Sequence, residues 1–157
     1  MPIKKKNLYH GAALMILAQD GRMTFRKSAK RPSGWYLINR TQPRSRFEGG
    51  AIYLYIKYLT GGDSAFNFTF TPDELEFFAN HAVSEGEMNY VALVCGMKGI
   101  CLLSVKDINE LEIHPLTATV RVTIEPGYQM RASNPAYPRR KAKVIAHKDF
   151  PNRLLSD

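Results

Sequence analysis

Cysteine and long apolar runs are scarce in this chain, and each shortage excludes a class of protein. The 157 residues contain two cysteines, which are too few for a disulfide framework and are typical of reduced thiols in a cytoplasmic protein. The longest uncharged, mainly apolar run covers residues 8–19, well short of the ~20 residues that span a bilayer. We therefore expect a cytoplasmic protein without a membrane partner.

Motifs that mark common catalytic sites are also missing. The chain has no glycine-rich dinucleotide or Walker loop and no Gly-x-Ser-x-Gly elbow. Cys95 and Cys101 have no histidine at a zinc-binding spacing, so we interpret them as small buried thiols, with a cysteine–histidine nucleophile pair as the alternative. We expect no cofactor, no metal site and no catalytic residue, and hence a protein that is not an enzyme.

Charge is present in an uneven pattern. Residues 1–62 hold 12 Lys and Arg but only two acids, whereas residues 63–125 hold 3 Lys and Arg and 10 acids. Residues 126–157 are basic again, with 7 Lys and Arg and 2 acids. A basic block attracts polyanions, because each neutralised phosphate releases condensed counterions. The alternative is a solvated surface that pairs with the acidic middle of the chain.

Hydrophobic periodicity predicts an α+β fold. Helices are expected over 8–19 and 72–84, and strands over 23–27, 35–39, 51–59, 65–71, 90–95, 100–104, 117–125, 128–132 and 141–147. A short helical turn is expected over 107–111. This order predicts a mixed, largely antiparallel sheet flanked by two helices, with a β-rich C-terminal extension.

Several of these elements carry specific signals. Thr71, Pro72 and Glu74 have the spacing of a capping box at a helix start. Residues 90–95 form a continuous apolar run, which is typical of a strand buried on both faces. Apolar residues surround the 8–19 helix, which predicts burial on most sides after an Asn7 cap. Strands 23–27 and 35–39 bracket the polar segment 28–34 and predict a hairpin with a basic loop.

The length suits a single domain spanning residues 1–157. Within it we expect a flexible basic leader at 1–7, an α/β core at 8–105, a β-rich extension at 106–150 and a tail at 151–157. No internal repeat or low-complexity segment interrupts this order.

The middle of the chain resembles a known superfamily in pattern. The tyrosine-rich run 53–58, the alternating phenylalanines of 66–70 and the apolar strand 90–95 resemble the core of the restriction-endonuclease-like, PD-(D/E)XK superfamily. This resemblance covers roughly residues 8–105 and implies a helix, three strands, a helix and a strand. Residues 9–12 and 90–96 are also similar to small bacterial proteins without assigned activity, which implies no function.

The residues that carry nuclease chemistry in that superfamily are replaced here. Lys57 occupies the lysine position, but Tyr55 stands where the resemblance implies a carboxylate, and Ile38 and Asn39 stand near the other acidic position. Metal-dependent phosphodiester hydrolysis needs carboxylates that hold Mg²⁺. We therefore expect no nuclease activity. The alternative is a divergent nuclease site, for which Glu48, Asp63 and Asp73 are the candidate carboxylates.

We interpret the chain as a non-catalytic nucleic-acid-binding module that uses its basic N-terminal half to bind DNA or RNA. The alternatives are the divergent nuclease and a protein-interaction or regulatory module of a bacterial or phage system. The candidate binding residues share a positive charge or a helix-start position, and they are Lys4, Lys5, Lys6, His10, Arg26, Lys27, Lys30, Arg31, Arg40, Arg44, Arg46 and Lys57.

Two features sharpen this interpretation. His10 follows three lysines at a helix start, which is the pattern of a phosphate site, although a buried histidine after a disordered leader is the alternative. The arginines and lysines of 26–31 and 40–46 lie in two loops that we expect to converge on one ligand. Aromatic residues among these charges offer stacking surfaces for bases, and they are Phe25, Trp35, Tyr36, Phe47, Tyr53 and Tyr55.

Overall fold

The structure is a computed structural model that describes residues 2–41, 52–62, 64–80, 88–125 and 129–156. Its elements are α1 (Lys5–Asp20), β1 (Met23–Lys27), β2 (Trp35–Arg40), β3 (Ile52–Leu59), β4 (Ala65–Thr69), α2 (Pro72–Asn80), β5 (Met88–Cys95), β6 (Gly99–Ser104), α3 (Val105–Glu110), β7 (Thr119–Ile124), β8 (Gln129–Ser133), β9 (Lys143–Ala146) and α4 (Asp149–Ser156). This content confirms the α+β class predicted from the sequence.

The strands form two sheets, namely the predicted mixed sheet and an antiparallel sheet that contains the strands of the predicted C-terminal extension. Sheet A has the order β1-β2-β3-β5-β6, and sheet B has the order β4-β7-β8-β9. In sheet A, β3 and β5 are parallel and the other neighbours are antiparallel. Every pair in sheet B is antiparallel. Helix α2 lies in the crossover that joins the parallel strands, as such connections require.

Strand β5 lies between β3 and β6 and is buried on both faces, as its continuous apolar run predicts. Val91 and Leu93 belong to one hydrophobic cluster, and Ala92 and Val94 belong to the other. Sheet A is therefore the middle layer of the fold.

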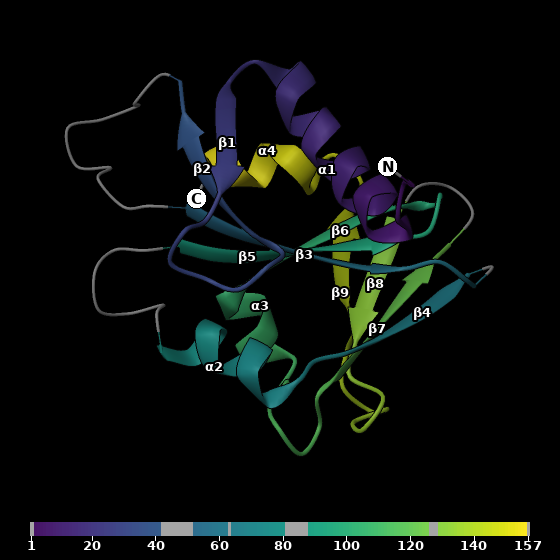
Figure 1. The fold of residues 1–157 in the computed structure, drawn as a ribbon. Coiled ribbons are helices and arrows are strands. Elements are labelled where there is room, and N and C mark those ends of the chain that lie inside the picture. Colours follow the sequence, from purple (N-terminus) through teal and green to yellow (C-terminus); the bar gives the residue numbers. More distant parts are fainter. Residues whose placement is uncertain (1, 42–51, 63, 81–87, 126–128, 157) are drawn as a thin grey trace.

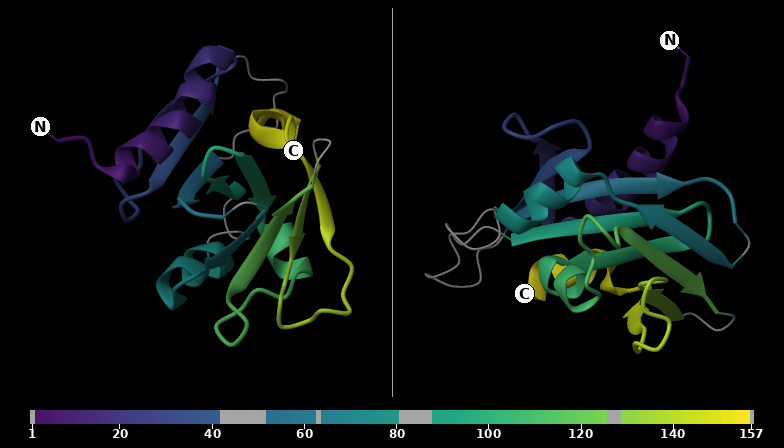
Figure 2. Two further views of the ribbon diagram at one scale, coloured as in Figure 1. Left: turned by 90° about the vertical axis from the view of Figure 1, so that its right-hand side faces the viewer. Right: turned by 90° about the horizontal axis from the view of Figure 1, so that it is seen from below.

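Helices α1 and α4 cover one face of sheet A, while sheet B, α2 and α3 cover the other (Figure 1). Helix α1 packs on β1, β3 and β5, and α4 packs on β6 and β9. Figure 2 shows the same arrangement from two further sides, with α1 on the outside of the molecule. None of the helices in the described residues has the length and hydrophobicity of a membrane-spanning segment.

Local sequence signals account for several element boundaries. The amide of Glu74 donates to Thr71 Oγ1 at 3.2 Å, and the Thr71 amide donates to Glu74 Oε1 at 2.8 Å, which confirms the capping box of α2. Helix α1 ends at Gly21, whose φ of 75° is a conformation that glycine adopts without a Cβ clash. The predicted hairpin is also confirmed, because β1 and β2 pair antiparallel across the segment 28–34.

The start and the exposure of α1 differ from the prediction. The helix begins at Lys5 after Lys4 in the cap position, so Asn7 is a helical residue and not the cap. The predicted burial on most sides is wrong, because Leu8, Met15 and Ile16 are 58%, 57% and 39% exposed. Sheet A offers one surface to this helix, and one surface covers only one side of a cylinder.

The C-terminal segment forms a helix where the sequence suggests a tail. Phe150 and Leu154 of α4 are buried against sheet A, and Phe150 has an extended backbone (φ −99°, ψ 117°) at a kink in this element. Arg153 Nη1 donates to Asp107 Oδ2 at 2.8 Å and so joins α4 to α3. Strand β4 lies within the range 8–105 but pairs with β7, so the two sheets are not separated at residue 105.

Candidate nucleic-acid interface

The start of α1 and the β1–β2 connection meet at one end of the molecule (Figure 2). Lys6 Nζ donates a hydrogen bond to Ser33 Oγ, which joins the two segments directly. Gly34 lies so close to α1 that a Cβ on it would be 3.7 Å from Cε1 of His10. Two basic segments that are separated in the sequence are therefore neighbours in the fold.

A cavity of about 220 Å³ opens where these segments meet β3. Strand β2 begins at Trp35, so its pairing with β3 stops at Tyr55 and β3 continues past it. The remaining part of β3 and the start of α1 enclose the cavity. Its lining residues are Lys6, His10, Ser33, Tyr55, Ile56, Lys57 and Tyr58, which include three of the twelve candidate binding residues.

His10 contributes a neutral ring to this cavity. The side chain is buried, and its Nδ1 lies 3.2 Å from the hydroxyl oxygen of Tyr36. Burial, together with the nearby charge of Lys6, lowers the pKa of His10 to about 4. At neutral pH the imidazole is therefore uncharged, and it offers a ligand hydrogen bonding rather than positive charge.

Lys57 is held by a carboxylate that the sequence interpretation assigned only to a helix cap. Its Nζ lies 3.2 Å from both carboxylate oxygens of Glu74. Burial opposes ionisation of Glu74, but hydrogen bonds from Thr71 and Tyr55 and the charge of Lys57 lower its pKa overall. Glu74 thus neutralises Lys57, whereas none of the residues that line the cavity is a carboxylate that could pair with Lys6.

Four further candidates are exposed and lie on or next to the two segments that meet here. Lys4 is the cap of α1 and Lys5 its first residue, whereas Lys27 ends β1 and Lys30 lies in the connection to β2. Arg26 is also exposed, but it alternates with Lys27 along β1 and therefore lies on the other face of the strand. We call the group Lys4, Lys5, Lys6, Lys27 and Lys30 the basic end.

Arg31 belongs to the core side of the hairpin. Its guanidinium carbon lies 3.7 Å from the ring centroid of Tyr53 and 4.4 Å from that of Trp35. Its Nη1 donates to Asn89 Oδ1 at 2.7 Å. These contacts give Arg31 a structural role, since its guanidinium lies within cation–π distance of two core rings and donates to a buried carboxamide.

Of the two basic segments that the sequence predicts to converge, the structure places Arg40 away from the segment 28–34. Arg40 is the last residue of β2, at the opposite end of the strand from the segment 28–34, and its Nη2 donates to the Leu154 carbonyl at 3.0 Å. A strand rises about 3.3 Å per residue, which separates the two ends. Arg44 and Arg46 lie outside the described residues.

The aromatic residues near these charges are mostly structural. Trp35 and Tyr53 are 1% and 7% exposed and belong to the core cluster under sheet B. Phe25, Tyr36 and Tyr55 are half-buried, and Phe47 lies outside the described residues. The basic end therefore offers lysine side chains more than ring faces, which suits phosphates better than bases.

A metal-dependent site would need a cluster of metal-binding side chains, and the part of the chain that the structure describes contains none. Within those residues no group of three or more His, Cys, Asp or Glu side chains has a metal-binding arrangement. Glu48 and Asp63 lie outside the described residues, and Asp73 is exposed in the first turn of α2. Burial raises the pKa of Cys95 to about 12 and holds that of Cys101 well above its usual range, so both thiols stay protonated.

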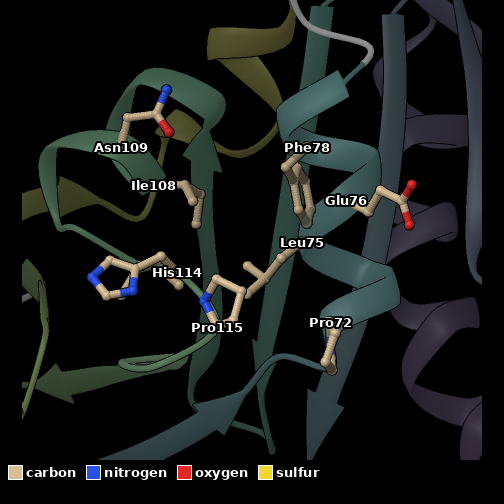
Figure 3. Close-up of a pocket in the computed structure, with 9 residues that line it drawn as sticks. Pro72, Leu75, Glu76, Phe78, Ile108, Asn109, His114 and Pro115 are labelled. Carbon is tan, nitrogen blue, oxygen red and sulfur yellow. The ribbon is translucent and has the colours of Figure 1, made fainter.

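A second, more apolar pocket of about 360 Å³ lies between α2 and α3. Figure 3 shows Leu75 and Phe78 of α2 facing Ile108 and Pro115 across the opening. His114 and Asn109 lie on the α3 side, and Glu76 points away from the opening. The size and the lining are typical of a site for an apolar group.

Comparison with known proteins leaves the function to be argued from these two sites. No family model matches the chain, and no curated protein or solved structure matches it. In sheet A and its helices the order is helix, three strands, helix and strand, but element order alone assigns no family. The resemblance to the restriction-endonuclease-like core therefore has no support beyond that order.

Proposed function

We propose that the protein binds the phosphate backbone of nucleic acid through the basic end and the adjoining cavity. The observation that carries the proposal is the meeting of α1 with the β1–β2 connection, since the five lysines of the basic end lie on or next to these two segments. Residues 2–41 contain one acid, Asp20, which lies at the other end of α1 and pairs with Arg22 at 2.5 Å. The charge of the basic end is thus not balanced from within its own segments.

The cavity supports phosphate as the bound group. Lys6 and the hydroxyl of Ser33 lie beside the neutral ring of His10, and such donors bind phosphate oxygens through charge-assisted and neutral hydrogen bonds. Trp35 and Tyr53 are buried and offer no ring face to a base. We therefore propose weak binding without strong sequence preference.

Salt titration tests this proposal. If four to six cations meet phosphates, log K falls against log salt with a slope of roughly −3 to −5. The triple variant Lys4→Ala, Lys27→Ala, Lys30→Ala should flatten the slope by about 2 to 3, equally for DNA and RNA of different sequence.

The matched control removes three equal charges elsewhere, through Lys98→Ala, Arg139→Ala and Lys148→Ala, which are exposed positions outside the basic end. We expect the control to keep the wild-type slope. Equal losses in both triple variants would leave only nonspecific attraction by net charge and would contradict the proposed site.

The pocket between α2 and α3 favours a second candidate function, the docking of a partner protein. It lies in the segment 63–125, which holds 10 acids against 3 Lys and Arg, so the complementary partner is a peptide with an apolar side chain beside basic residues. A fluorescent peptide that alternates leucine and lysine should bind wild type and lose affinity with Asp73→Lys and Glu76→Lys. Binding that persists in this variant would exclude the pocket's acidic surroundings as its cause.

A further inference from the structure

Helix α1 has a second apolar face that the described residues leave uncovered. Its inner face buries His10, Ala13 and Leu17 against the sheet. Its outer face exposes Leu8 and Met15, each by more than half of the side chain's accessible surface. Contiguous apolar surface on a soluble protein typically marks an interaction site.

The residues of the outer face follow the spacing of a coiled-coil seam. Exposed residues occur at alternating intervals of three and four, and they are Lys5, Leu8, Ala12, Met15 and Gln19. Ile16, 39% exposed, widens this stripe. The neighbouring Gly11 has open space where a Cβ would be, with no atom within 4 Å. Ala12 at the centre of the stripe is small and allows another helix backbone to approach closely.

The charges of α1 oppose its own dipole. Lysines occupy its start, no acidic residue lies in its first turn, and no basic residue lies in its last turn. Cations are unfavourable near the positive N-terminal end of a helix and favourable near the negative C-terminal end. In an antiparallel pair of identical helices, the N-terminal lysines of each helix would therefore lie beside the negative C-terminal end of the other.

We propose that α1 pairs antiparallel with α1 of a second copy of this chain, about a two-fold axis near Ala12. In this register Lys5 lies opposite Gln19 and the last turn of the partner helix, and Leu8 lies opposite Met15 and Ile16. Ala12 then lies opposite itself, where the helices are closest. The same patch serves both copies, which is the property of a closed two-fold interface.

The face fits a second copy better than a lipid surface. Helices that lie on membranes carry aromatic residues on the apolar face and basic residues along the polar face. The stripe of α1 has no aromatic residue, and its lysines lie at one end only. A parallel pair is also disfavoured, because it would bring the two sets of lysines together.

The size of the face predicts a weak dimer. A helix of 16 residues is about 24 Å long. One face of such a helix buries less area than the ~800 Å² per partner of a standard interface. Association should therefore depend on concentration. The proposal does not rest on nucleic-acid binding, and the cross-linking test leaves all five lysines of the basic end unchanged.

Cross-linking of single cysteines tests the contact. Both native cysteines are buried, so an added surface cysteine reacts alone. Ala12→Cys should form an oxidant-dependent disulfide dimer at least about tenfold faster than Ala18→Cys, which is exposed on the same helix outside the stripe. Adding Leu8→Gln and Met15→Gln should abolish the difference, while Met97→Gln, at an exposed apolar site elsewhere, should preserve it.

Charge exchange tests the orientation by sedimentation at about 0.15 M salt, where remote charges are screened. Gln19→Lys should weaken dimerisation by repelling Lys5 of the partner, and Lys5→Glu should weaken it by facing the negative helix end. The double variant should restore it, because the carboxylate introduced at position 5 and the ammonium introduced at position 19 attract only in the antiparallel pair. No restoration would overturn the antiparallel arrangement.

Two outcomes overturn the proposal as a whole. One is a protein that stays monomeric up to a concentration of about 0.5 mM and forms disulfide dimers equally fast through Cys at position 12 and at position 18. The other is binding to anionic vesicles of phosphatidylserine and phosphatidylcholine that Leu8→Gln and Met15→Gln abolish, in a protein that remains monomeric. That second result would assign the stripe to a lipid surface.

Discussion

Arg31→Ala should destabilise the protein while leaving nucleic-acid binding unchanged. The substitution removes a guanidinium that contacts the rings of Trp35 and Tyr53 and donates to Asn89 at 2.7 Å. A partly desolvated cation–π contact contributes about 0.5 to 2 kcal/mol, and a hydrogen bond from a charged group contributes about 1.5 to 3. Asn89 is 3% exposed, so its carboxamide would also lose a buried partner.

The expected loss is about 3 kcal/mol of unfolding free energy, because these terms overlap at one side chain. Urea denaturation followed by tryptophan fluorescence measures it, since Trp35 is the single tryptophan. Lys30→Ala is the matched control, because this neighbour is exposed and belongs to the basic end. It should change stability by less than about 0.5 kcal/mol and flatten the salt slope by about 0.8. The opposite pattern, a stable Arg31→Ala with a flatter slope, would refute the structural role of Arg31.

Three further outcomes follow from the contacts. Val94→Asp should prevent folding, because Val94 is 2% exposed and an unpaired buried charge costs several kcal/mol; a soluble variant with cooperative melting would contradict this. Burial opposes ionisation of Asp107, but hydrogen bonds from Lys143, the Ser104 amide and Arg153 lower the pKa of its carboxyl group below the usual 3.8. The ionised carboxylate therefore stabilises the folded protein above pH 3.8, and this stabilisation is lost as the pH falls through the lowered pKa. Acid titration of stability should therefore show a smaller loss in Asp107→Asn than in wild type. Because the pKa of His10 is about 4, affinity for DNA should stay flat between about pH 8 and pH 5.5, and a rise centred near 6.5 would show a charged imidazole at the site.

The sequence alone determined the local elements of this protein. The two-faced burial of β5, the capping box of α2 and the hairpin of β1 and β2 all depend on residues within a few positions of one another. Such signals act through backbone geometry and amphipathic spacing, which a short window contains. The predicted class followed from them.

The candidate site was only partly predictable for the same reason. The basic N-terminal half indicated Lys6, His10 and Lys57, which line one cavity in the structure. Ser33 and the pairing of Glu74 with Lys57 were missed, because nothing in the local sequence distinguishes a helix-capping glutamate from one that also reaches another strand. A lysine in an otherwise buried strand was the available signal, since such a lysine needs a counter-charge.

Tertiary structure decided everything that depends on distant partners. Strand β4 alternates like any sheet strand, yet it leaves sheet A and pairs with β7, about fifty residues further along the chain. Helix α1 is apolar all around, but sheet A covers one side and leaves the other exposed. The C-terminal residues become a helix because the apolar face of sheet A can bury Phe150 and Leu154. Periodicity sets which face of an element is apolar, whereas non-local packing selects what that face meets and whether it is covered.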